Sequence, residues 1–305
     1  MKELASDTVI LLLTYGTPRY LGEVKEYFSA IRKGPVREEE VAELTARYEA
    51  IGGLSPLTAH VERQRELLEE LLVDTEYGAC SILVASRYGK PSILEVVEKL
   101  VPSTKKIIAI PLSPFFSSFS TTGYIHALEK ALKIVGSQAK VEVVKDFALT
   151  PSFEEYWSEA LREMLKKVQK PYHVFFTAHS LPINGTEEDD YAQKFQRVAA
   201  SIAAKLGLPS HTVAWQSGRS TGWYGPCIED CISTLKDSDK GAVVIAPIGF
   251  TSEHLEVLYD LDIVCRNLVE EKGLDYLRVP MPNDSARYME SVVEALSADT
   301  HRGQM

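Results

Sequence analysis

Short apolar runs alternate along the chain with longer segments in which apolar and charged residues are mixed. The runs lie at residues 8–14, 80–86, 106–111, 141–145, 173–178, 212–216, 242–247 and about 275–279. Runs of this length, rich in Val, Ile and Phe, are typical of strands buried on both faces of a parallel sheet. In the segment 56–72, Val61 and several leucines recur about every 3.6 residues, which predicts an amphipathic crossover helix. The alternation therefore predicts an α/β fold.

The two halves of the chain carry similar segments. Residues 14–18, after the first apolar run, resemble residues 177–182, after the fifth, and residues 108–112 resemble residues 244–248. This weak repeat predicts two similar Rossmann-like domains, each with a four-stranded parallel sheet flanked by helices. Two such domains that face each other would form a cleft.

A domain boundary after residue 150 gives each half four strands. We expect a first domain at 1–150, a second at 151–283, and a C-terminal helix at about 284–305 that packs back on the first domain. Ligands of open α/β sheets bind beyond the carboxyl ends of the strands. The residues that follow those strands, Tyr15 and His179 among them, are therefore expected to line the cleft.

Composition and charge restrict the class of protein. The chain has 305 residues, of which 45% are hydrophobic and 25% charged, as in a soluble globular protein of roughly two domains. No run approaches the roughly 18 apolar residues of a membrane span, and the short run 9–13 follows an acidic start, unlike a signal peptide. We expect a cytoplasmic protein without membrane insertion. The net charge of −10 argues against a nucleic-acid partner.

The cysteines are scattered and include no CxxC pair. Cys80 and Cys265 are expected to be buried thiols, because a cytosolic setting disfavours disulfides. Cys227 and Cys231 are four residues apart and could share one face of a helix as a two-thiolate metal corner. A structural zinc site usually has four ligands, so buried thiols are the simpler interpretation here too.

His179 lies at the end of the apolar run 173–178 and is followed by Ser180, Leu181 and Pro182. A neutral imidazole at such a strand end can accept a proton or bind a metal near pH 7. A histidine that only hydrogen-bonds the backbone would give the same local pattern. This segment alone leaves both interpretations open.

A group of acidic residues follows the seventh apolar run. Glu253, Glu256 and Asp260 are three and then four residues apart, so on a regular helix they would share one face. A solvated outer face would also be acidic. Because the segment follows a buried strand directly, we expect part of this acidic stripe to face the cleft, where carboxylates could transfer cations.

Seven segments together resemble the ferrochelatase family, in order and in separation. They are Gly16-Thr17-Pro18, the segment Arg47 to Leu57, Ser86 to Pro91, the loop Pro111 to Tyr124, Ala178 to Pro182, Trp215-Gln216-Ser217 and His254-Leu255-Glu256. The resemblance covers residues 8 to about 283. It implies two Rossmann-like domains around a porphyrin cleft and the insertion of ferrous iron into a tetrapyrrole to make a haem.

The resemblance also assigns roles at the reaction centre. His179 and Glu256 would be the catalytic pair, facing each other across the porphyrin as proton acceptor or metal ligand, and Tyr15 would lie near the metal. Asp260 and Glu253 would form an outer path for the ion. These residue types suit the reaction, because metallation removes two pyrrole N–H protons while the hydrated cation loses its waters.

The porphyrin itself needs cations and an apolar bed. Basic and hydroxyl residues in or near the family-like segments are candidates for its propionates, and several aromatic residues are candidates for its ring. The first group is Arg32, Lys33, Arg47, Tyr48, Ser55 and Tyr124, and the second is Phe115, Phe116, Phe119 and Trp215. A surface charge and a core aromatic, respectively, are the alternatives for each member.

The chain departs from the family pattern in two places. Relatives often carry another acidic residue one turn after Asp260, where this chain has Val264, and Asp262 would point away from that ridge on a regular helix. A C-terminal cysteine group, which holds an iron–sulfur cluster in some members, is missing. We therefore expect a shortened outer path, no iron–sulfur cluster and no permanently bound cofactor, with Fe²⁺ as a substrate.

The branch of the family follows from two features. The sequence has no obvious hydrophobic lip insertion, and it has Tyr15 where membrane-associated relatives more often have an aliphatic residue. Both resemble the soluble, monomeric branch that converts coproporphyrin III to coproheme, with haem-pathway enzymes as transient partners. The alternatives are a protoporphyrin IX ferrochelatase, a sirohydrochlorin or cobalt chelatase, and a non-catalytic tetrapyrrole carrier.

Overall fold

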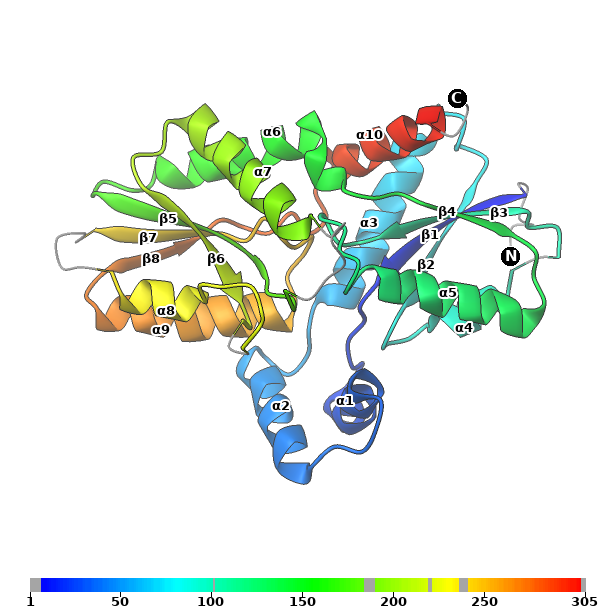
Figure 1. Cartoon of the computed structure of the whole chain (residues 1–305), viewed down its shortest axis with the longest axis horizontal. Helices are drawn as coiled ribbons and strands as arrows, with labels where there is room; N and C mark the ends of the chain where they lie inside the picture. The colour runs from blue at the N-terminus through cyan, green and yellow to red at the C-terminus, as the bar shows by residue number, and fades with distance from the viewer. Residues whose placement is uncertain (1–6, 101, 184–189, 219–220, 236–240, 303–305) are drawn as a thin grey trace.

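The computed structural model describes residues 7–100, 102–183, 190–218, 221–235 and 241–302, and it contains two four-stranded parallel sheets (Figure 1). The first sheet has the order β2-β1-β3-β4 and consists of β1 (Thr8–Thr14), β2 (Ser81–Ser86), β3 (Lys106–Pro111) and β4 (Lys140–Val143). The second has the order β6-β5-β7-β8 and consists of β5 (Tyr172–His179), β6 (His211–Gln216), β7 (Ala242–Ala246) and β8 (Asp275–Arg278). The predicted strands are thus confirmed.

Both sheets have the same strand order, so the sequence repeat is a structural repeat. β1 and β5 occupy equivalent central positions, and each pairs in parallel with the two strands that follow it in its half. The residues of β1 from Val9 to Leu13 are fully buried, as expected for a strand covered on both faces. The predicted α/β fold of two Rossmann-like halves is confirmed.

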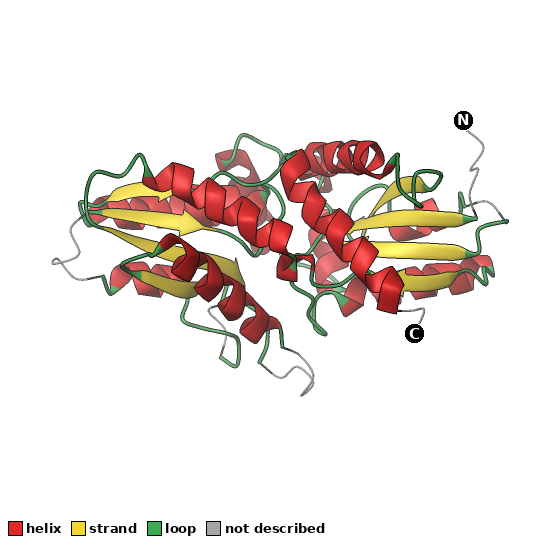
Figure 2. Ribbon diagram, turned by 90° about the horizontal axis from the view of Figure 1, so that it is seen from above, coloured by secondary structure: helices red, strands yellow, loops and turns green. Residues whose placement is uncertain are grey.

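Helices cover the sheets, as Figure 2 shows from above. The first half contains η1 (Leu21–Glu23), α1 (Val24–Arg32), α2 (Glu38–Ala50), α3 (Leu57–Leu72), α4 (Ile93–Val97) and α5 (Thr122–Val135). The rest of the chain contains η2 (Phe147–Leu149), α6 (Pro151–Leu165), α7 (Tyr191–Leu206), α8 (Ile228–Ser233), the π-helix η4 (Glu256–Cys265), α9 (Arg266–Glu271) and α10 (Ala286–Arg302). In Figure 1, α1 and α2 project from the body of the molecule.

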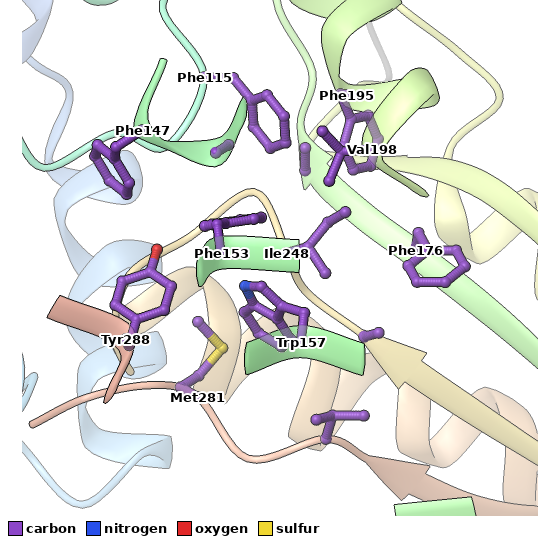
Figure 3. Packing of buried hydrophobic residues seen from close by; sticks show 14 of the residues in the cluster. Phe115, Phe147, Phe153, Trp157, Phe176, Phe195, Val198, Ile248, Met281 and Tyr288 are labelled. Carbon is purple, nitrogen blue, oxygen red and sulfur yellow. The ribbon is translucent and has the colours of Figure 1, made fainter. Parts of the chain in front are cut away.

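One large core joins the two halves. It includes Leu12 of β1 and Phe176 of β5, and an aromatic cluster around Phe153 and Trp157 fills the space beside α6 (Figure 3). The C-terminal helix α10 packs against both α3 and α6. The last helix thus contacts both halves, and the predicted domain bounds, including the assignment of this helix to the first domain, stay predictions.

Among the described residues, the helices are all too short or too polar to cross a membrane.

Candidate active site

His179 ends the central strand of the second sheet. Its Nδ1 hydrogen-bonds the carbonyl oxygen of Ser180, and the hydroxyl of Tyr191 donates to the carbonyl oxygen of His179 at 2.9 Å. The Nδ1 contact turns the other ring nitrogen, Nε2, away from the main chain, and 31% of the side chain is exposed. The predicted position at the carboxyl end of a central strand is confirmed.

Glu256 faces His179 from the first turn of the π-helix η4. Its Oε1 lies 3.5 Å from Nε2 of His179, and its Oε2 lies 3.6 Å from Nε2 of His254. The loop before η4 can approach β5 this closely because residue 249 is glycine, where a Cβ would lie 2.4 Å from the Cβ of Ala178. A carboxylate between two imidazoles results.

His179 and Glu256 strongly shift each other's pKa. Burial lowers the pKa of His179, but the Glu256 carboxylate and the Ser180 carbonyl outweigh it and raise this pKa to about 9. Burial raises the pKa of Glu256, yet the His179 and His254 imidazoles lower it well below its usual range. Near neutral pH the site therefore holds an imidazolium beside a carboxylate.

Asp260 follows one turn later in η4. Burial, and then the negative charge of Glu256, raise the pKa of Asp260 to about 7, against the opposing effect of Arg47. The guanidinium of Arg47 lies over the ring of Tyr259, 5.4 Å from its centroid. The carboxyl of Asp260 can therefore gain or lose a proton near neutral pH.

The predicted acidic stripe is wrong at Glu253. The helix begins after this residue, and the guanidinium of Arg278 holds its carboxylate, with Nη2 3.0 Å from Oε1. Arg278 also binds both carboxylate oxygens of Asp262, each at 2.7 Å. A π-helix closes i→i+5 turns, so the 3.6-residue period used for the prediction does not apply to this segment. Glu253 and Asp262 are thus neutralised beside the site.

Tyr15 lies just after β1, in the first half. Its ring packs against Tyr88, with centroids 4.9 Å apart, and 40% of the residue is exposed. Burial of the hydroxyl and then the charge of Glu256 raise the pKa of Tyr15 well above its usual range. The position of Tyr15 near the metal stays a prediction.

The candidate propionate residues are dispersed around this pair. Arg32 and Lys33 are exposed at the end of α1, and Arg47 binds the carboxylate of Glu43 on α2. Tyr48 is buried, with its hydroxyl 3.3 Å from Oγ1 of Thr17, and Ser55 accepts a hydrogen bond from the amide of Leu57. Tyr124 is buried on α5 under the guanidinium of Arg87. The structure leaves Arg32 and Lys33 the most accessible of the set.

Two members of the predicted aromatic bed belong to the core. Phe115 and Trp215 are each 1% exposed, and both rings contact Phe195 of α7. Phe116 is half-buried beneath Nζ of Lys145. An aromatic residue beside a buried strand has the same sequence pattern whether it faces core or ligand, so these positions were ambiguous.

The fourth predicted aromatic residue, Phe119, lies beside Trp223, which is next to His179. Phe119 is 54% exposed and contacts Trp223, whose centroid is 6.4 Å from that of Phe119 and 6.4 Å from that of the His179 imidazole. No sequence pattern points to Trp223, because it stands in an irregular segment. His254 stands in the family-like segment His254-Leu255-Glu256, but no role was predicted for it.

The cysteines do not form the metal corner that their spacing allowed. The thiol of Cys227 donates to Glu229 Oε2 at 2.5 Å, and burial raises the pKa of this thiol to about 11. Within the described part of the chain, no three His, Cys, Asp or Glu side chains are grouped so that they could hold a metal ion.

Comparison with known proteins identifies the family. The model of the ferrochelatase family matches residues 7–299. The chain belongs to the ferrochelatase family. It is therefore an enzyme that inserts metal into a porphyrin. The chain is 33% identical over 296 residues to the coproporphyrin III ferrochelatase of Anoxybacillus flavithermus, covering 93% of both chains. It is 34% identical over 303 residues to that of Geobacillus thermodenitrificans, covering 95% of both.

Solved structures of other chelatases share the fold. The sirohydrochlorin chelatase of Bacillus subtilis subspecies spizizenii, solved with cobalt, has a TM-score of 0.57 at 10% identity and covers 97% of both chains. CbiX, described as the terminal enzyme of sirohaem biosynthesis in denitrifying bacteria, has a TM-score of 0.54 at 12% identity and covers 95% of this chain and 98% of its own. At these identities the ferrochelatase family and these chelatases share architecture alone.

Proposed function

We propose that the chain inserts ferrous iron into coproporphyrin III to give coproheme, with His179 and Glu256 as its catalytic residues. The observation that carries the proposal is the pair of His179 and Glu256 at the carboxyl end of β5, with Nε2 and Oε1 3.5 Å apart. The curated relatives named above, which match almost the whole chain, support coproporphyrin III as the substrate.

The charge state of the pair suggests how protons and metal are exchanged. A protonated His179 cannot accept a pyrrole proton, and Glu256 is a weak base while it is paired with the imidazolium. A divalent cation that arrives beside Glu256 would replace the imidazolium as the partner of this carboxylate, and the His179 proton would pass to solvent, to which 31% of that side chain is exposed. The neutral imidazole could then accept a proton from a pyrrole nitrogen as the iron enters the ring.

Tyr15 and Asp260 complete the proposed path. The phenol oxygen of Tyr15 would lie on the opposite face of the porphyrin from His179 and contact the metal there. Asp260, whose pKa of about 7 allows either protonation state, would receive the second proton or guide the cation towards Glu256. Glu253 is excluded from this path, because Arg278 holds its carboxylate.

Coproporphyrin III carries four propionates, which need cationic or polar partners. Arg32 and Lys33 are exposed cations on a chain with a net charge of −10, and each can meet a carboxylate. We further propose that the protein works without a permanently bound cofactor or iron–sulfur cluster, as a cytoplasmic monomer with transient partners among haem-pathway enzymes.

Parallel metallation assays test the substrate. Anaerobic protein and Fe²⁺ are mixed with coproporphyrin III, protoporphyrin IX or sirohydrochlorin, and the absorbance change on metallation is followed. Faster conversion of coproporphyrin III supports the proposal, whereas equal or faster conversion of either other tetrapyrrole contradicts it. Porphyrin binding without any insertion, and unchanged by His179→Ala, would instead indicate a carrier.

A further inference from the structure

Gln64 is a fully buried polar residue that joins the two halves of the molecule. It lies on α3, which belongs to the first half and runs between the sheets in Figure 1, and its exposed fraction is 0%. Its amide Nε2 donates to the main-chain carbonyl of Asn283 at 2.6 Å and lies 3.4 Å from the carbonyl of Thr251. Both acceptors belong to the second half.

Asn283 continues this connection to the catalytic loop. It has a φ of 47°, and its side-chain Oδ1 accepts a hydrogen bond from the amide of Glu253 at 2.8 Å. Glu253 immediately precedes His254, and Glu256 follows two residues later. The side chain of Glu253 is separately held by Arg278. The segment that delivers Glu256 is therefore held at Thr251 and at Glu253 by residues outside it.

We infer that Gln64 is a positioning residue that, together with Asn283, sets the place of Glu256 relative to the first half of the molecule. The inference rests on the proposed role of Glu256. Because Tyr15 is on the first half and Glu256 on the second, a connection from α3 to residues 251–253 fixes the separation between the two groups. Insertion of a metal into a planar ring held between them depends on that separation.

The hydrogen bonding of Gln64 distinguishes positioning from simple stabilisation. Its Oε1 is buried and has no partner among the described residues. A buried, half-satisfied amide contributes little net stability, and an apolar side chain of similar shape is often equally stable there. The Gln64→Met variant keeps the length of the side chain and removes both donors, so it should affect catalysis more than folding.

The test compares three variants of the full chain with the parent in the iron-insertion assay. They are Gln64→Met, Asn283→Gly, which allows the positive φ but removes Oδ1, and the control Ser158→Ala. The Ser158 hydroxyl is equally buried and has no partner among the described residues, but it lies on α6. We expect Gln64→Met and Asn283→Gly to lower kcat about 10- to 100-fold, while the KM for porphyrin stays within about twofold.

The outcomes separate this inference from the proposed function. A parent chain that metallates neither porphyrin contradicts the proposed function. A parent that is active, with Gln64→Met and Asn283→Gly variants that keep kcat within about twofold or lose only thermal stability, overturns the positioning role. If Gln64→Met does not fold, Asn283→Gly decides. A double variant no slower than the slower single variant would support a shared connection, and multiplying effects would contradict it.

Discussion

The two halves of the molecule have one topology and different chemistry. Both central strands end in a polar side chain, Tyr15 after β1 and His179 at the end of β5, and in both halves a glycine lets neighbouring loops approach closely. After β3 the chain forms the regular helix α5, whereas after β7 it forms the π-helix η4. Of these two helices, only the π-helix carries a carboxylate that pairs with the strand-end residue. The repeated topology therefore places the strand ends, and the altered helix adds the carboxylate of the acid–base pair.

Removing the two strand-end residues in turn is the strongest test of this difference. We expect His179→Ala to lower kcat/KM for iron insertion about 10³-fold, since the proton acceptor is lost, and Tyr15→Phe to lower it about 10-fold. Steady-state metallation rates measure both. Equal losses from the two variants would show that the halves contribute alike.

Breaking the pair from the other side should change the titration of His179. Glu256→Gln removes the charge that raises the pKa of this imidazole, so the pKa should fall from about 9 towards 6.5 or lower, with a loss of kcat of about 10²-fold or more. Histidine NMR across pH 5–10 measures the shift. A raised folded-state pKa stabilises the fold below about pH 6.5, and this contribution is lost as pH rises through about 9. The variant should lack that dependence, and an unchanged pKa would refute the pairing.

Replacing Asp260 tests whether a second residue of the π-helix, besides Glu256, contributes to catalysis. Because the pKa of this carboxyl is raised to about 7, its ionised form destabilises the fold. Asp260→Asn should therefore gain thermal stability relative to the parent as pH rises from about 4 to 7. It should also lower kcat about 10-fold and abolish a rise in rate near pH 7. Melting curves and rate profiles over this range check both effects.

Replacing Arg278 should have the smallest effect on the rate of iron insertion. Arg278→Met leaves two part-buried carboxylates, those of Glu253 and Asp262, without their cation, so unfolding should become easier by about 2 kcal/mol. Because neither carboxylate belongs to the proposed path, and Asn283 still holds the main chain of Glu253, kcat should change less than about threefold. Denaturant titration and the metallation assay measure the two quantities. A large loss of kcat with unchanged stability would return Glu253 to the metal path.

The strands and the central histidine could be predicted because their signals are local. Each strand is a short apolar run between turn residues, and His179 follows such a run directly, so the predicted and observed bounds agree within two residues. The family resemblance anticipated Glu256 as the partner of His179 across the porphyrin, but 3.5 Å between Oε1 and Nε2 leaves no room for a ring, so that arrangement is wrong. Their direct approach was not predicted. It depends on packing between β5 and the loop after β7, which no local pattern records.

The errors arose where contacts are long-range or periodicity changes. The pairing of Glu253 with Arg278 spans 25 residues, and the π-helix does not follow the period assumed for the acidic stripe. Phe115 and Phe119 stand in one loop, yet the first is core and the second exposed. Side-chain direction in an irregular loop is set by the tertiary fold, and hydrophobicity alone does not reveal it.

The placement of α10 has a consequence for synthesis of the protein. This last helix packs against both α3 and α6, so a nascent chain that has emerged only to residue 285 leaves facing apolar surfaces of both halves uncovered. Asn283, which contacts Gln64, also emerges only shortly before α10. We therefore expect a chain truncated before α10 to be inactive and prone to aggregate, because its apolar core stays open.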